Sequence, residues 1–252
     1  MTTLYCIHGM WGTSAIWDGL RARFTAAGHT SHAPLLPHHD RRRGEEPHPG
    51  LALLGLQDYV DFLVDDIAQL AEPPVIVGHS MGSFLTQAVA ARTQPAGVVL
   101  LSPAPTAAIN APGIAPVRSV WSIVSKWGWW RRPTLIDPAA ARWGIFNNVP
   151  VEIASAEIDA LVWDSGRVLA DLSAPWAVRN GAATVDYARL TCPALIVSGG
   201  DDRITPPKIA RVTARAWRGP VDYHELPGVG HWLFHAPVVD RVGDLIESWL
   251  SR

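Results

Sequence analysis

The sequence is poor in the features that mark several classes of protein. Only two cysteines occur among 252 residues, Cys6 and Cys192. Neither has a spacing typical of a disulfide framework or a metal site, so we expect reduced thiols and a cytoplasmic protein. No apolar run approaches the roughly 18 residues that span a bilayer, and no basic, signal-like segment opens the chain. We therefore expect a soluble chain with no membrane partner.

Charge is also scarce. Charged residues make up 17% of the chain, the net charge is −2, and three consecutive basic residues occur only at 41–43. This distribution provides no basic field for nucleic acid or an anionic membrane. Hydrophobic residues, in contrast, reach 48% and include 12 tryptophans. Such a composition supports one large core, and an apolar cavity besides.

Short apolar runs alternate with helical periodicity along most of the chain. Strands are predicted at 3–7, 29–33, 75–77, 97–102, 193–198 and 221–226, with amphipathic helices between them. This alternation predicts a three-layer α/β/α fold around a mostly parallel sheet of about six strands. Residues 103–190 interrupt it with helical candidates at 117–126, 138–146, 151–161 and 164–172. We predict a helical insertion there, with 1–102 and 191–252 forming the core domain.

The run from Gly78 to Gly82 has the pattern G-x-S-x-G, with Ser80 at its centre. A β-branched run precedes it and a helical pattern follows, which is the context of a nucleophile elbow. The tight turn requires residues without side chains two positions before and after the serine. Ser80 is therefore the candidate nucleophile. The N–H of Met81, at the start of the helix, is a candidate oxyanion donor.

A serine nucleophile needs a base that is itself held by an acid. His231 follows the last predicted strand and is the candidate base. Asp201 and Asp202 follow the strand before it, and either could orient the imidazole. The second oxyanion donor is expected from the loop after the first strand, with the Met10 N–H preferred and Trp11 as the alternative. Because carboxyl ends of parallel strands share one edge, the fold would bring these groups together.

Four motifs together resemble those of the α/β-hydrolase superfamily: residues 8–12, 78–82, 200–207 and 228–232. The resemblance covers the whole chain and implies a Ser-Asp-His triad without a metal or another cofactor. It also selects Asp202, which directly precedes the Arg-hydrophobic-x-Pro segment. By the same resemblance, residues 103–190 would form a cap over the active site. The chain begins at what resembles the family's third strand, so the N-terminal edge strands are expected to be missing.

Several other residues suggest chemistry and also have a plainer interpretation. Trp11, Trp143 and Phe146 are predicted to line a substrate pocket, although packing under the cap would suit them equally. His8 and His79 are interpreted as structural. The polar loop at 37–50 contains His38, His39 and Asp40, but without further ligands at a suitable spacing we interpret it as a solvated surface loop.

The resulting prediction is a serine hydrolase that cleaves small to medium apolar carboxylic esters through an acyl-enzyme. A Ser rather than an Asp in the elbow argues against the dehalogenase and epoxide-hydrolase branches of the superfamily. Carbon–carbon hydrolysis of ring-cleavage products, lactone hydrolysis and thioester hydrolysis on the same triad remain alternatives. A ligand-binding receptor without activity is another. The partner would be a small-molecule ester, and the protein a monomer or homodimer.

Overall fold

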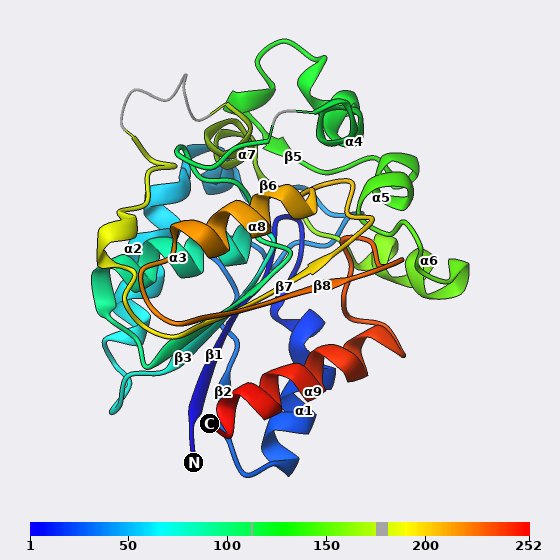
Figure 1. The fold of residues 1–252 in the computed structure, drawn as a ribbon. Helices are drawn as coiled ribbons and strands as arrows, with labels where there is room; N and C mark the ends of the chain where they lie inside the picture. The colour runs from blue at the N-terminus through cyan, green and yellow to red at the C-terminus, as the bar shows by residue number, and fades with distance from the viewer. Residues whose placement is uncertain (112, 175–180) are drawn as a thin grey trace.

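A six-stranded sheet, all of whose strands are parallel, forms the centre of the molecule (Figure 1). The computed structural model describes residues 1–111, 113–174 and 181–252. The strand order is β2-β1-β3-β4-β7-β8. The strands are β1 (Thr3–Ile7), β2 (Thr30–His32), β3 (Val75–His79), β4 (Gly97–Leu101), β7 (Ala194–Gly199) and β8 (Val221–Leu226). All six correspond to predicted strands, and the predicted fold class is confirmed.

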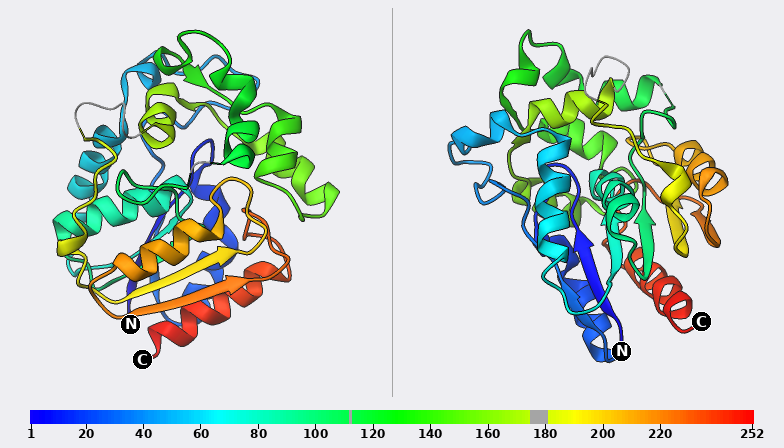
Figure 2. Two further views of the ribbon diagram at one scale, coloured as in Figure 1. Left: turned by 45° about the horizontal axis from the view of Figure 1, so that its top comes forward. Right: turned by 90° about the vertical axis from the view of Figure 1, so that its left-hand side faces the viewer.

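Helices cover both faces of this sheet. On one face lie α1 (Asp18–Ala26) and α9 (Val238–Leu250), which contact each other. On the other lie α2 (Leu56–Ile67), α3 (Met81–Thr93) and α8 (Pro207–Ala216) (Figure 2). Successive side chains of a strand point to opposite faces of the sheet, so each face has its own hydrophobic core. Leu4 and Cys6 pack on the face covered by α1 and α9, whereas Tyr5 and Ile7 pack on the face covered by α2, α3 and α8.

The inserted segment, residues 103–190, leaves the sheet after β4 and returns at β7. Its ribbon lies above the carboxyl ends of the strands (Figure 1). Its helices are α4 (Ile114–Val124), α5 (Pro138–Gly144), α6 (Val151–Ala160) and α7 (Gly166–Ser173), with an antiparallel pair of β5 (Pro133–Thr134) and β6 (Asp164–Ser165). The division into a core and a cap domain stays a prediction, and residues 112 and 175–180 of its range lie outside the described part.

One local prediction differs from the structure because of the way a helix is capped. Residues 164 and 165 were expected to be helical but form β6. The Ser165 hydroxyl accepts the N–H groups of Arg167 and Val168, so α7 begins at residue 166. The Thr13 side chain caps the 3-10 turn that begins at residue 14. Within the described ranges, the 3-10 turns are Ser14–Trp17, Pro49–Leu53, Trp129–Arg131 and Tyr187–Arg189.

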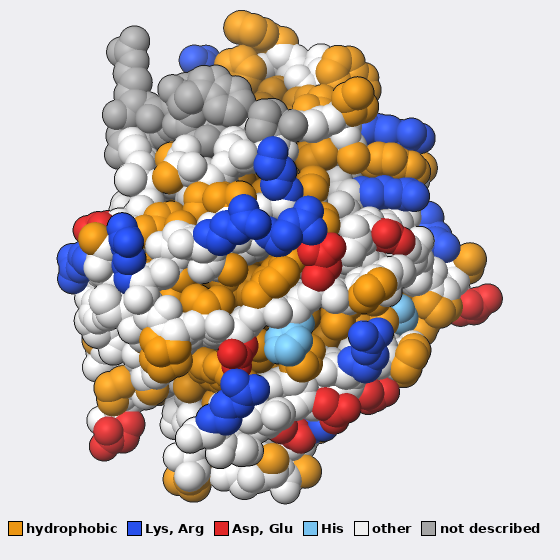
Figure 3. Space-filling view, in the orientation of Figure 1, with side chains coloured by type: hydrophobic (Ala, Val, Ile, Leu, Met, Phe, Trp, Pro, Cys, Tyr) orange, Lys and Arg blue, Asp and Glu red, His pale blue; other side chains and the backbone are white. Residues whose placement is uncertain are grey.

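The surface agrees with the low charge of the sequence. On the face in Figure 3, basic and acidic side chains are dispersed among uncharged ones. None of the helices in the described ranges is both long and apolar enough to cross a membrane.

Candidate active site

Ser80 stands at the turn between β3 and α3 in a strained conformation, with φ 56° and ψ −121°. Few non-glycine residues adopt positive φ, and such strain is concentrated at functional sites. The flanking glycines are required by close approach. A Cβ on Gly78 would collide with the carbonyl of Gly82, and one on Gly82 would collide with the carbonyl of Ile7. The G-x-S-x-G run therefore packs β1, β3 and α3 tightly around the serine.

His231 and Asp202 meet at the same edge of the sheet. The His231 Nδ1 lies 2.8 Å from Asp202 Oδ2, and both side chains are buried. The other oxygen, Asp202 Oδ1, accepts the backbone N–H groups of Ile204 and Thr205, each at 2.8 Å. These two bonds fix the carboxylate, so Oδ2 stays directed at the imidazole. Asp201 instead contacts Asn148 at the surface, with its Oδ2 3.0 Å from the amide nitrogen.

Thr205 is a component of this site that the sequence reasoning missed. Its hydroxyl lies 2.9 Å from Asp202 Oδ2, 3.2 Å from His231 Nδ1 and 3.0 Å from the Ser102 carbonyl oxygen. A hydroxyl can donate one proton and accept others, so it can adjust to the charge on the pair. Its place three residues after Asp202 is the only sequence signal that could have indicated it.

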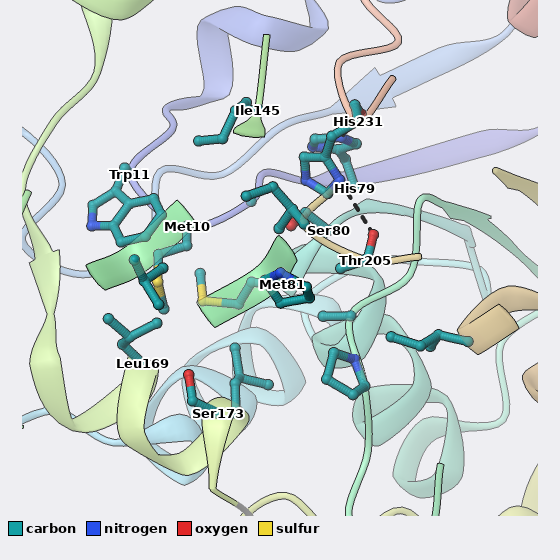
Figure 4. A pocket seen from close by; sticks show the side chains of 18 of the residues that line it. Met10, Trp11, His79, Ser80, Met81, Ile145, Leu169, Ser173, Thr205 and His231 are labelled. Atoms are coloured by element: carbon teal, nitrogen blue, oxygen red, sulfur yellow. Dashed lines mark hydrogen bonds between the residues drawn. The ribbon is translucent and has the colours of Figure 1, made fainter. Parts of the chain in front are cut away.

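The side chain of Ser80 lies beside His231 at the cavity (Figure 4). Among the described residues, nothing accepts or donates a hydrogen bond at Ser80 Oγ in this structure. Catalytic hydrogen bonds are often long in enzymes without substrate and tighten when it binds. His79 helps to hold the backbone of the base: its Nε2 is 3.1 Å from the His231 carbonyl oxygen and must donate to it.

His8 and His79 are both neutral, buried imidazoles. His8 Nε2 accepts the Leu36 N–H at 3.2 Å, so the proton is on Nδ1, which donates to the Gly9 carbonyl at 2.9 Å. Burial, and then the charge of a neighbouring imidazole, lowers the pKa of each to about 3. Groups with such pKa values would be unsuitable proton acceptors near neutral pH. Their contacts match the structural interpretation.

The backbone geometry distinguishes between the two donors expected from the loop after β1. The Trp11 N–H is already donated to Asp164 Oδ2 at 3.1 Å. The Met10 N–H has no acceptor among the described residues, and Met10 lines the cavity next to Ser80. Gly9 brings this loop against the nucleophile, because a Cβ at Gly9 would be 3.1 Å from the Ser80 Cβ. Met81 begins α3, where a helix leaves its first N–H groups without intrahelical partners.

A cavity of about 440 Å³ opens onto Ser80 and His231. Most of its wall is apolar and comes from both the core and the inserted segment. From the inserted segment come Val117, Val120 and Val124 of α4, and Leu169 and Leu172 of α7. The few polar side chains that line the cavity include Asn110, Ser173 and Thr205. An apolar cavity with few polar groups is typical of a small-molecule site.

Of the three predicted pocket residues, only Trp11 lines this cavity. Trp143 is not among the lining residues, and two cations cover its ring: the guanidinium carbons of Arg118 and Arg203 are 4.2 and 4.8 Å from the ring centroid. Phe146 is fully buried and packs against Trp232 at 5.0 Å between centroids. Neither Trp143 nor Phe146 lines this cavity, so the expectation for these two residues is corrected.

The loop at 37–50 also differs from expectation. Most of it is exposed or half-buried, but His39 is buried and lies 3.1 Å from the buried Asp164. Its neighbour His38 stacks on His48 with ring centroids 3.7 Å apart. Across the described residues, no group of three His, Cys, Asp or Glu side chains is arranged to hold a metal ion.

Comparison with known proteins identifies the family to which this fold and this site belong. The model of the Alpha/beta hydrolase family matches residues 4–241, and the chain belongs to that family. A monoacylglycerol lipase of Mycolicibacterium smegmatis is 26% identical over 96% of this chain and 85% of its own length.

Solved structures share the fold. A pyrethroid hydrolase from Sphingobium faniae superimposes with a TM-score of 0.71 at 20% identity, over 98% of this chain and 96% of its own. A methylesterase from Arabidopsis gives 0.72 at 14% identity, over the full length of both chains.

Proposed function

We propose that this protein is a serine hydrolase that cleaves carboxylic esters of small to medium apolar substrates through an acyl-enzyme. The observation that carries the proposal is the 2.8 Å contact between His231 Nδ1 and Asp202 Oδ2, at the wall of an apolar cavity that also holds Ser80. The lipase and the methylesterase that it resembles carry the names of ester-cleaving enzymes.

In this mechanism Ser80 Oγ attacks the carbonyl carbon while His231 Nε2 takes its proton. Asp202 keeps the other imidazole proton on Nδ1 and stabilises the imidazolium. The Met10 and Met81 N–H groups stabilise the negative oxygen of the tetrahedral intermediate. His231 then gives its proton to the leaving alcohol. Water, deprotonated by His231, attacks the acyl-enzyme, and the proton returns to Ser80 as the acid departs.

The cavity sets an expectation for substrate size. At roughly 30 Å³ for each water-sized group, 440 Å³ holds about 15 non-hydrogen atoms. A p-nitrophenyl ester with an acyl chain of about four to six carbons has that size. The apolar wall favours aliphatic or aromatic groups and disfavours charged ones, because a charge would lose its hydration without gaining a partner.

The test is a p-nitrophenyl ester series from acetate to dodecanoate, with wild type and Ser80→Ala, together with labelling by a fluorophosphonate. We expect kcat/KM to be greatest near butyrate or hexanoate and labelling to occur at Ser80. Ser80→Ala should abolish labelling and lower kcat at least about 10³-fold, as loss of a triad nucleophile does. Absence of both turnover and labelling in the wild type would refute the proposal.

A further inference from the structure

Asp164 is a fully buried carboxylate of the inserted segment, and it contacts three parts of the core at once. Oδ2 accepts the Trp11 N–H at 3.1 Å and lies 3.1 Å from His39 Nε2. Oδ1 accepts the Tyr59 hydroxyl at 3.0 Å and the Ser165 N–H at 2.6 Å. A buried charge needs this many partners to offset its lost hydration. The carboxylate thus links β6, α2, the loop after β2 and the loop after β1.

Its charge is balanced within the cluster. Burial alone would raise the pKa of Asp164, but His39 and the donated hydrogen bonds lower it below its usual value. Burial likewise lowers the pKa of His39, and Asp164 more than reverses that effect. The pair is therefore an ion pair: Asp164 accepts hydrogen bonds from Trp11, Tyr59 and Ser165. It also lies within ion-pair distance of His39.

The backbone of Trp11 is held from both sides by the same short stretch of the inserted segment. Asp164 accepts its N–H, and its carbonyl accepts the Val162 N–H at 2.8 Å. Trp11 has φ 59°, which is unfavourable for a residue with a side chain. A conformation of this kind persists only where its surroundings hold it. Here the two hydrogen bonds from residues 162–164 do so.

The turn that contains Trp11 also carries Met10. It spans Gly9 to Gly12 and is closed by one backbone bond, from the Gly12 N–H to the Gly9 carbonyl at 3.2 Å. The Met10 N–H belongs to the Gly9–Met10 peptide of this same four-residue turn, so a change in how Trp11 is held would be expected to alter the turn and, with it, the direction of that N–H. An oxyanion donor acts only if it points at the place where charge develops, and small displacements reduce its effect strongly.

We propose that Asp164 is a positioning residue for the oxyanion hole: it holds Trp11 in its strained conformation and so directs the Met10 N–H toward the reacting carbonyl. The inserted segment thereby completes the site as well as forming the wall of the cavity. This inference rests on the proposed ester hydrolysis. It assigns Asp164 no contact with substrate.

The test is Asp164→Asn. Its amide nitrogen must replace one carboxylate oxygen. On the Oδ1 side it would face two donors, Tyr59 and Ser165, whereas on the Oδ2 side a neutral His39 can accept from it. The nitrogen is therefore expected at Oδ2, where it cannot accept the Trp11 N–H. We expect kcat for p-nitrophenyl butyrate to fall about 10- to 100-fold, with KM within about twofold.

Asp171→Asn is the matched control. Asp171 is another buried carboxylate of the inserted segment, in α7, and its Oδ2 accepts a core N–H, that of Leu56, at 3.3 Å. It does not contact Trp11. We expect this variant to lower the melting temperature while kcat stays within about threefold of wild type. Assays are run well below both melting temperatures.

Equal kcat values for the two variants, or a loss in Asp164→Asn that appears only in KM, would overturn the inference. If Asp164→Asn does not fold, indole-3-lactate placed at position 11 by nonsense suppression replaces the Trp11 N–H by an ester oxygen and so removes this donor while keeping the indole side chain. The same fall in kcat is expected, and an unchanged kcat would overturn the inference. If the wild type itself does not hydrolyse esters, the proposed function has failed instead.

Discussion

Replacing Asp202 by Asn tests the proposed triad, because the surroundings of Asp202 determine how the amide must lie. Asp202 Oδ1 accepts two backbone N–H groups, from Ile204 and Thr205, each at 2.8 Å. An amide nitrogen there would leave both without an acceptor, at a cost of about 1–3 kcal/mol each. The amide oxygen therefore takes that position, and the nitrogen takes the place of Oδ2, opposite His231 Nδ1.

An amide nitrogen at that place donates, so Nδ1 must accept and the imidazole proton moves to Nε2. His231 can then no longer take the proton of Ser80. The same change of tautomer in a Ser-His-Asp protease lowers kcat about 10⁴-fold, which corresponds to about 5 kcal/mol of transition-state stabilisation. Thr205 can accept the new N–H while donating to the Ser102 carbonyl at 3.0 Å, so we expect the variant to fold.

The assay is kcat for p-nitrophenyl butyrate near neutral pH, with the melting temperature as the test of folding. Asp201→Asn is the control: its carboxylate accepts a surface amide and should leave kcat within about threefold. An Asp202→Asn variant that keeps a tenth of wild-type activity would refute the tautomer argument. Equal losses in the two variants would remove the preference for Asp202.

Two further predictions concern stability. Gly82→Ala would place a Cβ against the Ile7 carbonyl oxygen and 2.6 Å from the His8 carbonyl oxygen, and should cost about 1–3 kcal/mol of stability or prevent folding. Gly19→Ala in helix α1 is the control: no atom lies within 4 Å of the added Cβ, so this variant should be neutral or more stable by about 1 kcal/mol. Denaturation curves that rank the two variants otherwise would contradict the packing argument. Mild acid should already destabilise the protein, because His8 and His79 have pKa values of about 3 in the folded state and about 6.5 in the unfolded chain. Between pH 6 and 4.5 the unfolded chain binds more protons than the folded one at these two histidines, which together should lower the free energy of unfolding by roughly 4 kcal/mol. The raised pKa of the buried His39 contributes in the opposite direction. A flat profile in urea titrations would refute this.

Much of the core could be predicted because its signals are local. Each strand of the sheet is a short apolar run between turn residues, and each flanking helix has its own periodicity. The elbow is one continuous strand–turn–helix, so its glycines and Ser80 are recognisable in five residues. Parallel topology then brings the ends of β3, β7 and β8 to one edge, which is why His231 and Asp202 could be proposed without coordinates.

The residues that line the pocket were harder to predict, because the inserted segment lacks the regular hydrophobic pattern of the core. Trp143 and Phe146 are as aromatic as Trp11, and composition could not distinguish a residue that lines the cavity from one that does not. The separating facts are long-range: Arg118 and Arg203 cover Trp143, and Trp232 packs against Phe146.

By itself, the sequence determined the elements, their parallel arrangement and the chemical types at the strand ends, since these follow from periodicity, turn residues and sheet topology. Only the tertiary structure decided which polar groups are buried together. His39 has the sequence context of a surface loop, and Asp164 that of a helix start 125 residues later. They meet because the inserted segment returns over the loop after β1, and the loss of water at that contact makes their charges depend on each other.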